Sequence, residues 1–276
     1  MKKLLLPFLF IAFSTNAQEK EMITLKWKLT DTLSYKTFMY GYTLEEKIKK
    51  AETETNIERK NKLLKEIERN KLNYETLILP DSKGNFDVKM ILKATKADSV
   101  ETYISKMAKL NKNVVLRGKF TPEGKILSFY YEQNKKNLIS LLFELPQKSV
   151  KIGDEWNIDV DMISLDQHFK ADSLHKKNTV RLKDIVERNG NKIAIIEYDL
   201  NEYVSGSLMK KKSLNSKQNE LSEKPYLKAI HKIIGEFNID KGFWISYNGY
   251  RETKGNISIW GMNNNKKSVL KLILKK

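Results

Sequence analysis

Apolar and polar residues alternate along much of the chain, and the first clear example lies between residues 22 and 30. Large apolar side chains occupy positions 23, 25, 27 and 29, while Thr or Lys occupies the positions between them. In an extended backbone, successive side chains point to opposite faces, so a period of two marks a half-buried strand. The pattern predicts strands at 22–30 and 34–42, the second of them aromatic on one face.

Short turn sequences rich in Gly and Asn punctuate the rest of the alternating pattern. Glycine ends three of the four, where it supplies the left-handed conformation of a bulged hairpin turn. Four such signals predict an antiparallel meander. The turns at 81–84, 121–124, 189–191 and 238–242 join predicted strands 74–80 with 86–95, 113–120 with 125–131, 178–188 with 192–204, and 228–238 with 243–251, and further strands follow at 257–261 and 269–274.

Two stretches, 44–72 and 135–144, follow helical spacing instead. In the first, a threonine followed three residues later by glutamate occurs twice, as in the capping box that opens a helix. This predicts a pair of helices at 44–53 and 56–72 that lie on the sheet. The second stretch is short, strongly apolar and followed by Pro146, which favours a buried helix that ends there.

These patterns together predict a mainly β protein whose core is an antiparallel, strongly twisted sheet of about ten strands. The sheet is expected as a meander or a half-barrel, with small helical insertions near 44–72 and 135–144. A polar stretch at 209–224, rich in Lys, Ser, Asn and Gln, predicts a long loop. Residues 18–276 are expected to form one domain, and Pro146 marks the point at which two lobes would divide.

The first 17 residues have the features of a secretory signal peptide. Two lysines precede an apolar run at 4–13, and small residues follow up to Ala17 at the expected cleavage site. A run of this length cannot span a bilayer, which needs about 20 residues. The sequence therefore predicts a soluble exported chain, periplasmic or extracellular, without a transmembrane segment. Cysteine is absent, which excludes disulfides, thiol chemistry and a lipid anchor on cysteine.

The chain is strongly basic, with a formal net charge of +17 that becomes +15 without Lys2 and Lys3. Arginine occurs at only six positions, and the lysines are scattered in pairs and triplets. Nucleic-acid-binding proteins cluster their charge and use arginine for forked contacts to phosphate. Together with export, this predicts no nucleic-acid partner. The lysines are expected to form a solvated surface, or one weakly attracted to anionic glycans or lipid headgroups.

The most distinctive segment of the mature chain runs from Leu145 to Trp156 and reads LPQKSVKIGDEW. Gly153 and Asp154 are expected to form a tight turn, and Trp156 to begin an alternating strand that continues to Met162. The segment resembles the Leu-Pro-x-Lys-x-Val-x-x-Gly-Asp-x-Trp stretch of a family of uncharacterised exported bacterial proteins, many of them lipoproteins.

A second stretch, residues 235–242, is similar to the Gly-x-Phe-x-aliphatic-Asp-x-Gly hairpin of the same family. The resemblance implies a mainly β exported domain. The family has no agreed activity, so the resemblance implies nothing about catalysis. This chain departs from the family because it lacks a lipid-anchoring cysteine and carries the helical stretch at 44–72.

No catalytic, metal or cofactor pattern stands out in the sequence, and no cofactor is predicted. Five acidic residues could supply calcium ligands, but two of them alternate with apolar residues as on the wet face of a strand, and no loop has EF-hand spacing. The three histidines are too far apart for a recognisable zinc site. The acidic residues are Asp154, Glu155, Asp159, Asp161 and Asp166, and the histidines are His168, His175 and His231.

Aromatic residues are plentiful on both faces of several predicted strands. One face is expected to meet the core, and the other a helix, a ligand or a partner. Burial under the predicted helices is the simpler explanation. The alternative is an aromatic-lined groove for a hydrophobic or glycan ligand. The candidate ligand-binding residues are Phe38, Tyr40, Tyr42, Trp156 and Trp244.

Three classes of function are compatible with these features. The first hypothesis is an exported, non-enzymatic binding protein whose hydrophobic or glycan ligand lies on an aromatic-lined sheet face. The second is a structural or interaction protein of the cell envelope that docks through its lysine-rich surface. The third is an exported hydrolase, which no visible catalytic motif supports.

Overall fold

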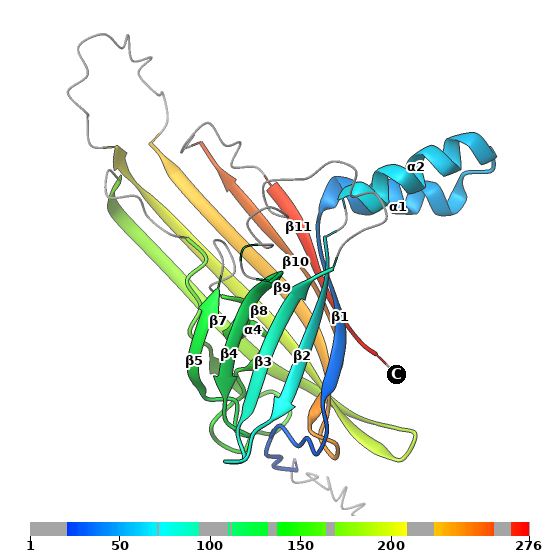
Figure 1. The fold of residues 1–276 in the computed structure, drawn as a ribbon. Helices are drawn as coiled ribbons and strands as arrows, with labels where there is room; N and C mark the ends of the chain where they lie inside the picture. The colour runs from blue at the N-terminus through cyan, green and yellow to red at the C-terminus, as the bar shows by residue number, and fades with distance from the viewer. Residues whose placement is uncertain are drawn as a thin grey trace, which may run out of the picture.

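The computed structural model describes residues 21–70, 72–93, 110, 112–131, 137–163, 169–208, 224–256 and 266–275. Within these ranges the protein is mainly β, and eleven strands form one antiparallel sheet that is not closed into a barrel (Figure 1). The predicted fold class is confirmed. One face of the curved sheet, the inner face, packs against a short buried helix, and the outer face carries two longer helices (Figure 1).

Two successive meanders make up the sheet. The first contains β1 (Leu33–Gly41), β2 (Leu72–Pro80), β3 (Phe86–Leu92), β4 (Val114–Phe120) and β5 (Ile126–Tyr131). The second contains β6 (Glu155–Asn157), β7 (Phe169–Arg188), β8 (Asn191–Leu208), β9 (Tyr226–Asn238), β10 (Phe243–Gly255) and β11 (Lys266–Leu274). The helices are α1 (Tyr42–Thr53), α2 (Ile57–Asn70) and α4 (Leu138–Phe143).

The two meanders join where β1 pairs with β11, so the first and last strands along the chain are neighbours in the middle of the sheet. The order is β5-β4-β3-β2-β1-β11-β10-β9-β8-β7-β6, which leaves β5 and β6 as the two edges. Between these edge strands the chain crosses the inner side of the sheet and forms α4 on the way (Figure 1). Residues on both sides of Pro146 therefore contribute strands to the same sheet.

The turns predicted to end in glycine do so with a left-handed backbone. At Gly84, Gly124 and Gly242, φ is 78°, 77° and 69°. Gly242 is also constrained by contact, because a Cβ atom there would come within 2.4 Å of the backbone nitrogen of Lys28. That nitrogen donates a hydrogen bond to Gly242 O at 3.0 Å, so the β9–β10 turn is docked on the N-terminal segment.

The strand predicted at 22–30 is wrong, although its pattern of burial is correct. Ile23 and Trp27 are buried and the residues next to them are more exposed. The segment bonds to an extended neighbour only at an isolated bridge between Ile23 and Val150. It crosses the ends of strands instead, and Trp27 N donates to Pro122 O at 2.7 Å. Alternate burial requires only an extended backbone on an apolar surface, whereas a strand also requires a ladder of hydrogen bonds.

The strand predicted from Trp156 to Met162 is wrong for the same reason. Only β6, at its beginning, pairs with the sheet. The residues that follow, 158–163, which we call the strap, run across the inner face and belong to no strand. Ile158, Val160 and Met162 are nevertheless buried in the core, which explains the alternating pattern.

The two helices predicted near 44–72 are confirmed as α1 and α2. They form a pair on the outer face of the sheet, from which they project in Figure 1. Ala51 and Ile67 of the helices are buried together with Tyr40 and Val269 of the strands beneath. This small second core is separate from the main core on the inner face.

The predicted helix caps are wrong in detail. α1 begins after Gly41, and no side chain makes a capping hydrogen bond there. At α2, Asn56 rather than Thr55 supplies the cap, because Asn56 Oδ1 accepts a hydrogen bond from Arg59 N at 3.1 Å. A carboxamide next to the first helical residue serves this purpose as well as a threonine hydroxyl.

The remaining predictions concern the lengths of helices and strands and the segments that the structure does not describe. The helix predicted near 135–144 is confirmed as α4, and β7 and β8 extend beyond the predicted strands at 178–188 and 192–204. The predicted signal peptide at 1–17, nearly all of the predicted loop at 209–224 and the predicted strand at 257–261 lie outside the described residues.

The main core surrounds α4, all six residues of which are buried. The last carbonyl groups of a helix have no partner within it and must find one elsewhere. Here three aromatic side chains donate hydrogen bonds to three consecutive carbonyl oxygens, which fixes the helix against the inner face. The bonds join Tyr247 Oη to Leu141 O (2.9 Å), Trp244 Nε1 to Leu142 O (2.7 Å) and Trp27 Nε1 to Phe143 O (3.0 Å).

Candidate functional site

The aromatic residues predicted to bind a ligand do not lie together. Phe38 and Tyr40 are on the outer face of β1, where they pack against the α1–α2 pair. Trp156 is on the edge strand β6, and Trp244 is inside the main core. The side chain of Tyr42 lies outside the described part of the structure. Trp156 also packs against the main core. The four described side chains therefore lie on both faces of the sheet and do not line a single groove.

Trp244 fills the core and lines no cavity. Its side chain is fully buried (0% exposed), and its indole N–H is used by Leu142 O. The ring packs edge-to-face against Phe237 and Tyr247. Gly235 on the neighbouring strand makes room for it, because a Cβ atom there would come within 2.6 Å of the indole. Packing in the core therefore explains why a tryptophan is present at this position.

A groove opens beside α4, between the edge strand β5 and the strap. Its volume is about 790 Å³. One part of its lining, the apolar wall, comes from β5 and α4, and another part, the polar wall, comes from the strap, from α4 and from the residues that flank α4. The apolar wall contains Ile126, Leu127, Phe129 and Ile139, and the polar wall contains Asn137, Ser140, Glu144, Asp159 and Asp161.

The apolar wall lies where the sheet ends. Among the described strands, β5 pairs only with β4. Leu127 and Phe129 on this edge are 48% and 45% exposed. Neighbouring apolar side chains that remain exposed beside a cavity are typical of an interaction surface.

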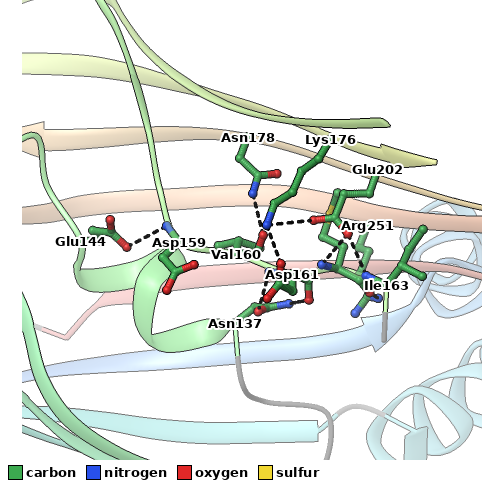
Figure 2. Close-up of polar contacts among 11 residues, drawn as sticks. Asn137, Glu144, Asp159, Val160, Asp161, Ile163, Lys176, Asn178, Glu202 and Arg251 are labelled. Carbon is green, nitrogen blue, oxygen red and sulfur yellow. Dashed lines mark hydrogen bonds and ion pairs between the residues drawn. The ribbon is translucent and has the colours of Figure 1, made fainter. Parts of the chain in front are cut away.

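Asn137 and Glu144, which flank α4, hold one part of the strap by its backbone (Figure 2). Asn137 Nδ2 donates to Asp161 O at 2.5 Å, and Asn137 Oδ1 accepts from Asp161 N at 3.2 Å. Glu144 Oε2 accepts from Asp159 N at 3.3 Å. Burial raises the pKa of the Glu144 carboxyl above its usual range. The Asp161 carboxylate in turn accepts from Lys176 Nζ at 2.5 Å.

Glu202 and Arg251 hold the far end of the strap (Figure 2). Glu202 Oε2 accepts hydrogen bonds from Met162 N and Ile163 N, both at 2.9 Å. Arg251 Nη2 donates to Met162 O at 2.8 Å. The Glu202 side chain is only 4% exposed, and a carboxylate buried to this extent depends on such bonds.

Further polar groups lie behind the strap. Asn178 Nδ2 donates to Val160 O at 2.5 Å, and Lys176 Nζ lies 3.9 Å from Glu202 Oε1. The buried atoms Glu202 Oε1, Arg251 Nε and His231 Nε2 have no hydrogen-bond partner within the described residues. The strap thus covers a group of buried charged side chains in addition to the apolar core that Ile158, Val160 and Met162 enter.

His231 is buried next to Arg251, its partner across β9 and β10. Burial and the neighbouring guanidinium charge lower the pKa of His231 to about 3. Its imidazole is therefore neutral at neutral pH. Burial also lowers the pKa of Arg251, which nevertheless stays charged at neutral pH.

Two of the acidic residues singled out from the sequence, Asp154 and Asp161, bind a backbone N–H group and a lysine. Asp154 Oδ2 accepts from Lys151 N at 3.0 Å and closes the turn before β6, and Asp161 is paired with lysine as described. Asp166 and His168 lie outside the described residues. Within the part of the chain that the structure describes, no group of three or more His, Asp or Glu side chains is placed to hold a metal ion.

Sequence reasoning missed the groove because its residues read as parts of ordinary elements. β5 has the sequence ILSFYY, with apolar side chains on both faces. Such a strand is expected in the interior of a sheet with both faces covered. The available signal was this two-sided apolar character, but only the strand order places β5 at an edge.

No known family model matches the sequence, and no curated protein matches it. The resemblance carried by residues 145–156 therefore stays a prediction. None of the described helices is both long and apolar enough to cross a membrane.

Proposed function

We propose that the protein is an exported, non-enzymatic binding protein that holds an apolar ligand in the groove between β5 and the strap. The observation that carries the proposal is a cavity of about 790 Å³ with one apolar wall at the open edge of the sheet. Sites for small ligands have volumes of about 300–1,000 Å³ and combine mostly apolar walls with a few polar groups. The aliphatic residues Ile126, Leu127 and Ile139 favour a hydrophobic ligand over a glycan.

The polar wall indicates what the other end of the ligand carries. The lining includes the carboxylates Glu144, Asp159 and Asp161 and one lysine, Lys125. Lys176 pairs with Asp161 at 2.5 Å, which leaves a smaller excess of negative charge. That excess favours a polar end that donates hydrogen bonds, such as an amine or hydroxyl, and disfavours a fatty acid. Asn137 and Ser140 add neutral hydrogen-bonding groups beside the carboxylates.

Binding of N-phenyl-1-naphthylamine, a neutral apolar fluorescent amine, tests the proposal on the purified chain. We expect saturable fluorescence enhancement, and Phe129→Ala should weaken binding roughly tenfold or more because it removes much of the apolar wall. Phe38→Ala removes the same side chain from the outer face and serves as the matched control, with unchanged affinity. Circular dichroism of both variants checks that they fold.

Native mass spectrometry and organic extraction of the protein purified from its own cell envelope would identify a resident ligand. An apolar molecule with a hydroxyl or amine end is the expected result. The proposal is rejected if the dye does not bind saturably, or if Phe129→Ala and Phe38→Ala weaken it equally. An anionic fatty acid as the resident ligand would contradict the role given to the acidic wall.

A further inference from the structure

A second hollow lies on the outer face of the sheet, away from the groove. Its volume is about 330 Å³. Lys232 of β9, Tyr250 of β10 and Lys267 and Lys271 of β11 surround it, and Lys49 of α1 closes one side. The lining thus combines an aromatic ring from β10 with lysines that come from three other elements.

The register of the strands produces the hollow. Asn248 on β10 pairs with Ile234 on one side and with Lys271 on the other, so a short side chain lies between two longer ones. Tyr250 lies two residues further along the same face, next to Lys232 and Val269. Val269 is itself buried against the α1–α2 pair, which places the hollow at the foot of these helices.

Aromatic rings orient two of the lysines. Lys267 Nζ lies 4.3 Å from the centroid of the Tyr250 ring, and Lys271 Nζ lies 5.7 Å from that of Tyr40. A cation over an aromatic face is attracted to it without losing its capacity to donate hydrogen bonds. Both ammonium groups therefore lie close to aromatic rings beside the hollow.

The charge of the lining is positive, with four lysines and the single carboxylate of Glu197. Glu197 is already bound by Arg181 at 2.7 Å and by Lys183 at 3.7 Å. Asp199 is shared by Lys177 and Lys232, and Glu252, the partner of Lys267 across β10 and β11, also pairs with Lys254. Among the described residues around the hollow, cations still outnumber carboxylates, which favours an anionic ligand.

We propose that this hollow binds an anionic glycan, with its charged group among Lys232, Lys267 and Lys271 and a sugar ring against Tyr250. Lysine is a point charge without a fixed fork, so it suits sulfate, phosphate or carboxylate on a sugar. The α1–α2 pair projects from the sheet beside the hollow (Figure 1), which obstructs the approach of a flat bilayer and favours a free glycan over lipid headgroups. The site is independent of the apolar groove, and its ligand has the opposite charge.

Isothermal titration calorimetry with a sulfated hexasaccharide prepared from heparin tests this proposal, with neutral maltohexaose for comparison. We expect the sulfated sugar alone to bind, more weakly as salt increases. The double variant Lys267→Gln/Lys271→Gln should lose roughly tenfold or more in affinity because two charge-assisted hydrogen bonds are removed. Lys148→Gln/Lys151→Gln changes the net charge equally at exposed positions elsewhere and is the matched control.

Tyr250→Ala separates a defined site from general attraction to a basic surface. We expect this uncharged substitution to weaken binding of the sulfated sugar severalfold. Equal losses in the two lysine double variants, or no effect of Tyr250→Ala, would overturn the proposal. The proposal would also be overturned if the protein bound phosphatidylglycerol vesicles through Lys267 and Lys271 but did not bind the sulfated sugar. Dye binding in the groove should be unchanged in all three variants, so failure here is distinguishable from failure of the proposed function.

Discussion

α4 and the strap both cross the inner face of the sheet without belonging to it, and they satisfy their backbone groups in different ways. Buried N–H and C=O groups need hydrogen-bond partners wherever they lie. α4 satisfies part of them through helical hydrogen bonds, and three neutral aromatic donors bind the carbonyls at its end. The strap relies on amide and charged side chains, namely Asn137, Glu144, Asn178, Glu202 and Arg251.

This difference explains why the cavity lies along the strap. Neutral aromatic donors bring large apolar surfaces with them, so the space at the end of α4 where they bind fills with side chains. Carboxylate and guanidinium groups cannot be surrounded by apolar side chains without a large desolvation cost. The side of the strap next to these groups therefore stays polar, and Glu144, Asp159 and Asp161 lie along the groove.

The largest effect is expected from Trp244→Ala, which disrupts the aromatic core that holds α4. The change removes a fully buried indole and the donor to Leu142 O, so the free energy of unfolding should fall by about 3–5 kcal/mol. Urea unfolding measures it. Trp156→Ala removes the same side chain from a half-buried place on an edge strand and should cost clearly less. Equal losses of unfolding free energy in the two variants would show that the core around α4 contributes no more to stability than the edge strand does.

Glu202→Ala most directly disrupts the polar contacts that hold the strap. Met162 N and Ile163 N lose their acceptor, and Arg251 loses the nearby carboxylate, so the free energy of unfolding should fall by about 3 kcal/mol. Glu202→Gln retains an acceptor oxygen and should lose less. Asp199→Ala, which removes a more exposed carboxylate, should cost at most about 1 kcal/mol. A loss for Glu202→Ala no larger than that for Asp199→Ala would contradict the role of Glu202.

The buried His231 makes stability near the strap depend on pH. Its pKa is about 3 in the folded protein and about 6.5 in the unfolded chain, so only the unfolded chain takes up this proton as the pH falls through that interval. The free energy of unfolding should therefore fall with decreasing pH by up to about 1.4 kcal/mol per unit.

Urea unfolding between pH 6.5 and 5 measures this effect, because the carboxyls with lowered pKa, such as Glu75 and Asp81, lose their contribution only at more acidic pH. Glu144, whose pKa is raised, acts in the opposite direction, so the comparison with a His231 variant assigns the slope. His231→Gln should flatten the dependence in this interval. A wild-type protein whose stability is constant over the interval, or a variant with the same slope, would show that His231 takes up its proton without hindrance in the fold.

Asn137→Ala should have the smallest effect on the free energy of unfolding, and it tests whether the strap can open separately from α4. The change removes two hydrogen bonds to the backbone of Asp161 and should cost about 1–2 kcal/mol. Amide hydrogen exchange at 158–163 should accelerate, while exchange at α4 should change little. Asn191→Ala, which removes an amide from an exposed turn, is the control and should leave the strap unaffected. Equal acceleration at α4 would mean that the two segments open together.

Much of the fold could be predicted because its signals are local. Hairpin turns depend on a few residues such as Gly84, Gly124 and Gly242, and α1 and α2 depend on helical spacing within the segment itself. The candidate site was not predictable in this way. Phe129, Asn137, Asp159 and Glu202 come from four separate elements, and no spacing along the chain relates them.

The sequence by itself determined which segments are extended, which are helical and which side of each faces the core, because these depend on backbone preference and the period of apolar residues. The tertiary structure alone decided which extended segments pair. Residues 22–30 and 158–163 have the alternation of strands but form no strand, because they cross the ends and the inner face of the sheet instead of lying alongside an edge strand. The tertiary structure also decided that β5 is an edge strand. It placed Phe38 and Tyr40 on the outer face of the sheet and Trp244 in the main core, since these positions depend on contacts between residues far apart in the chain.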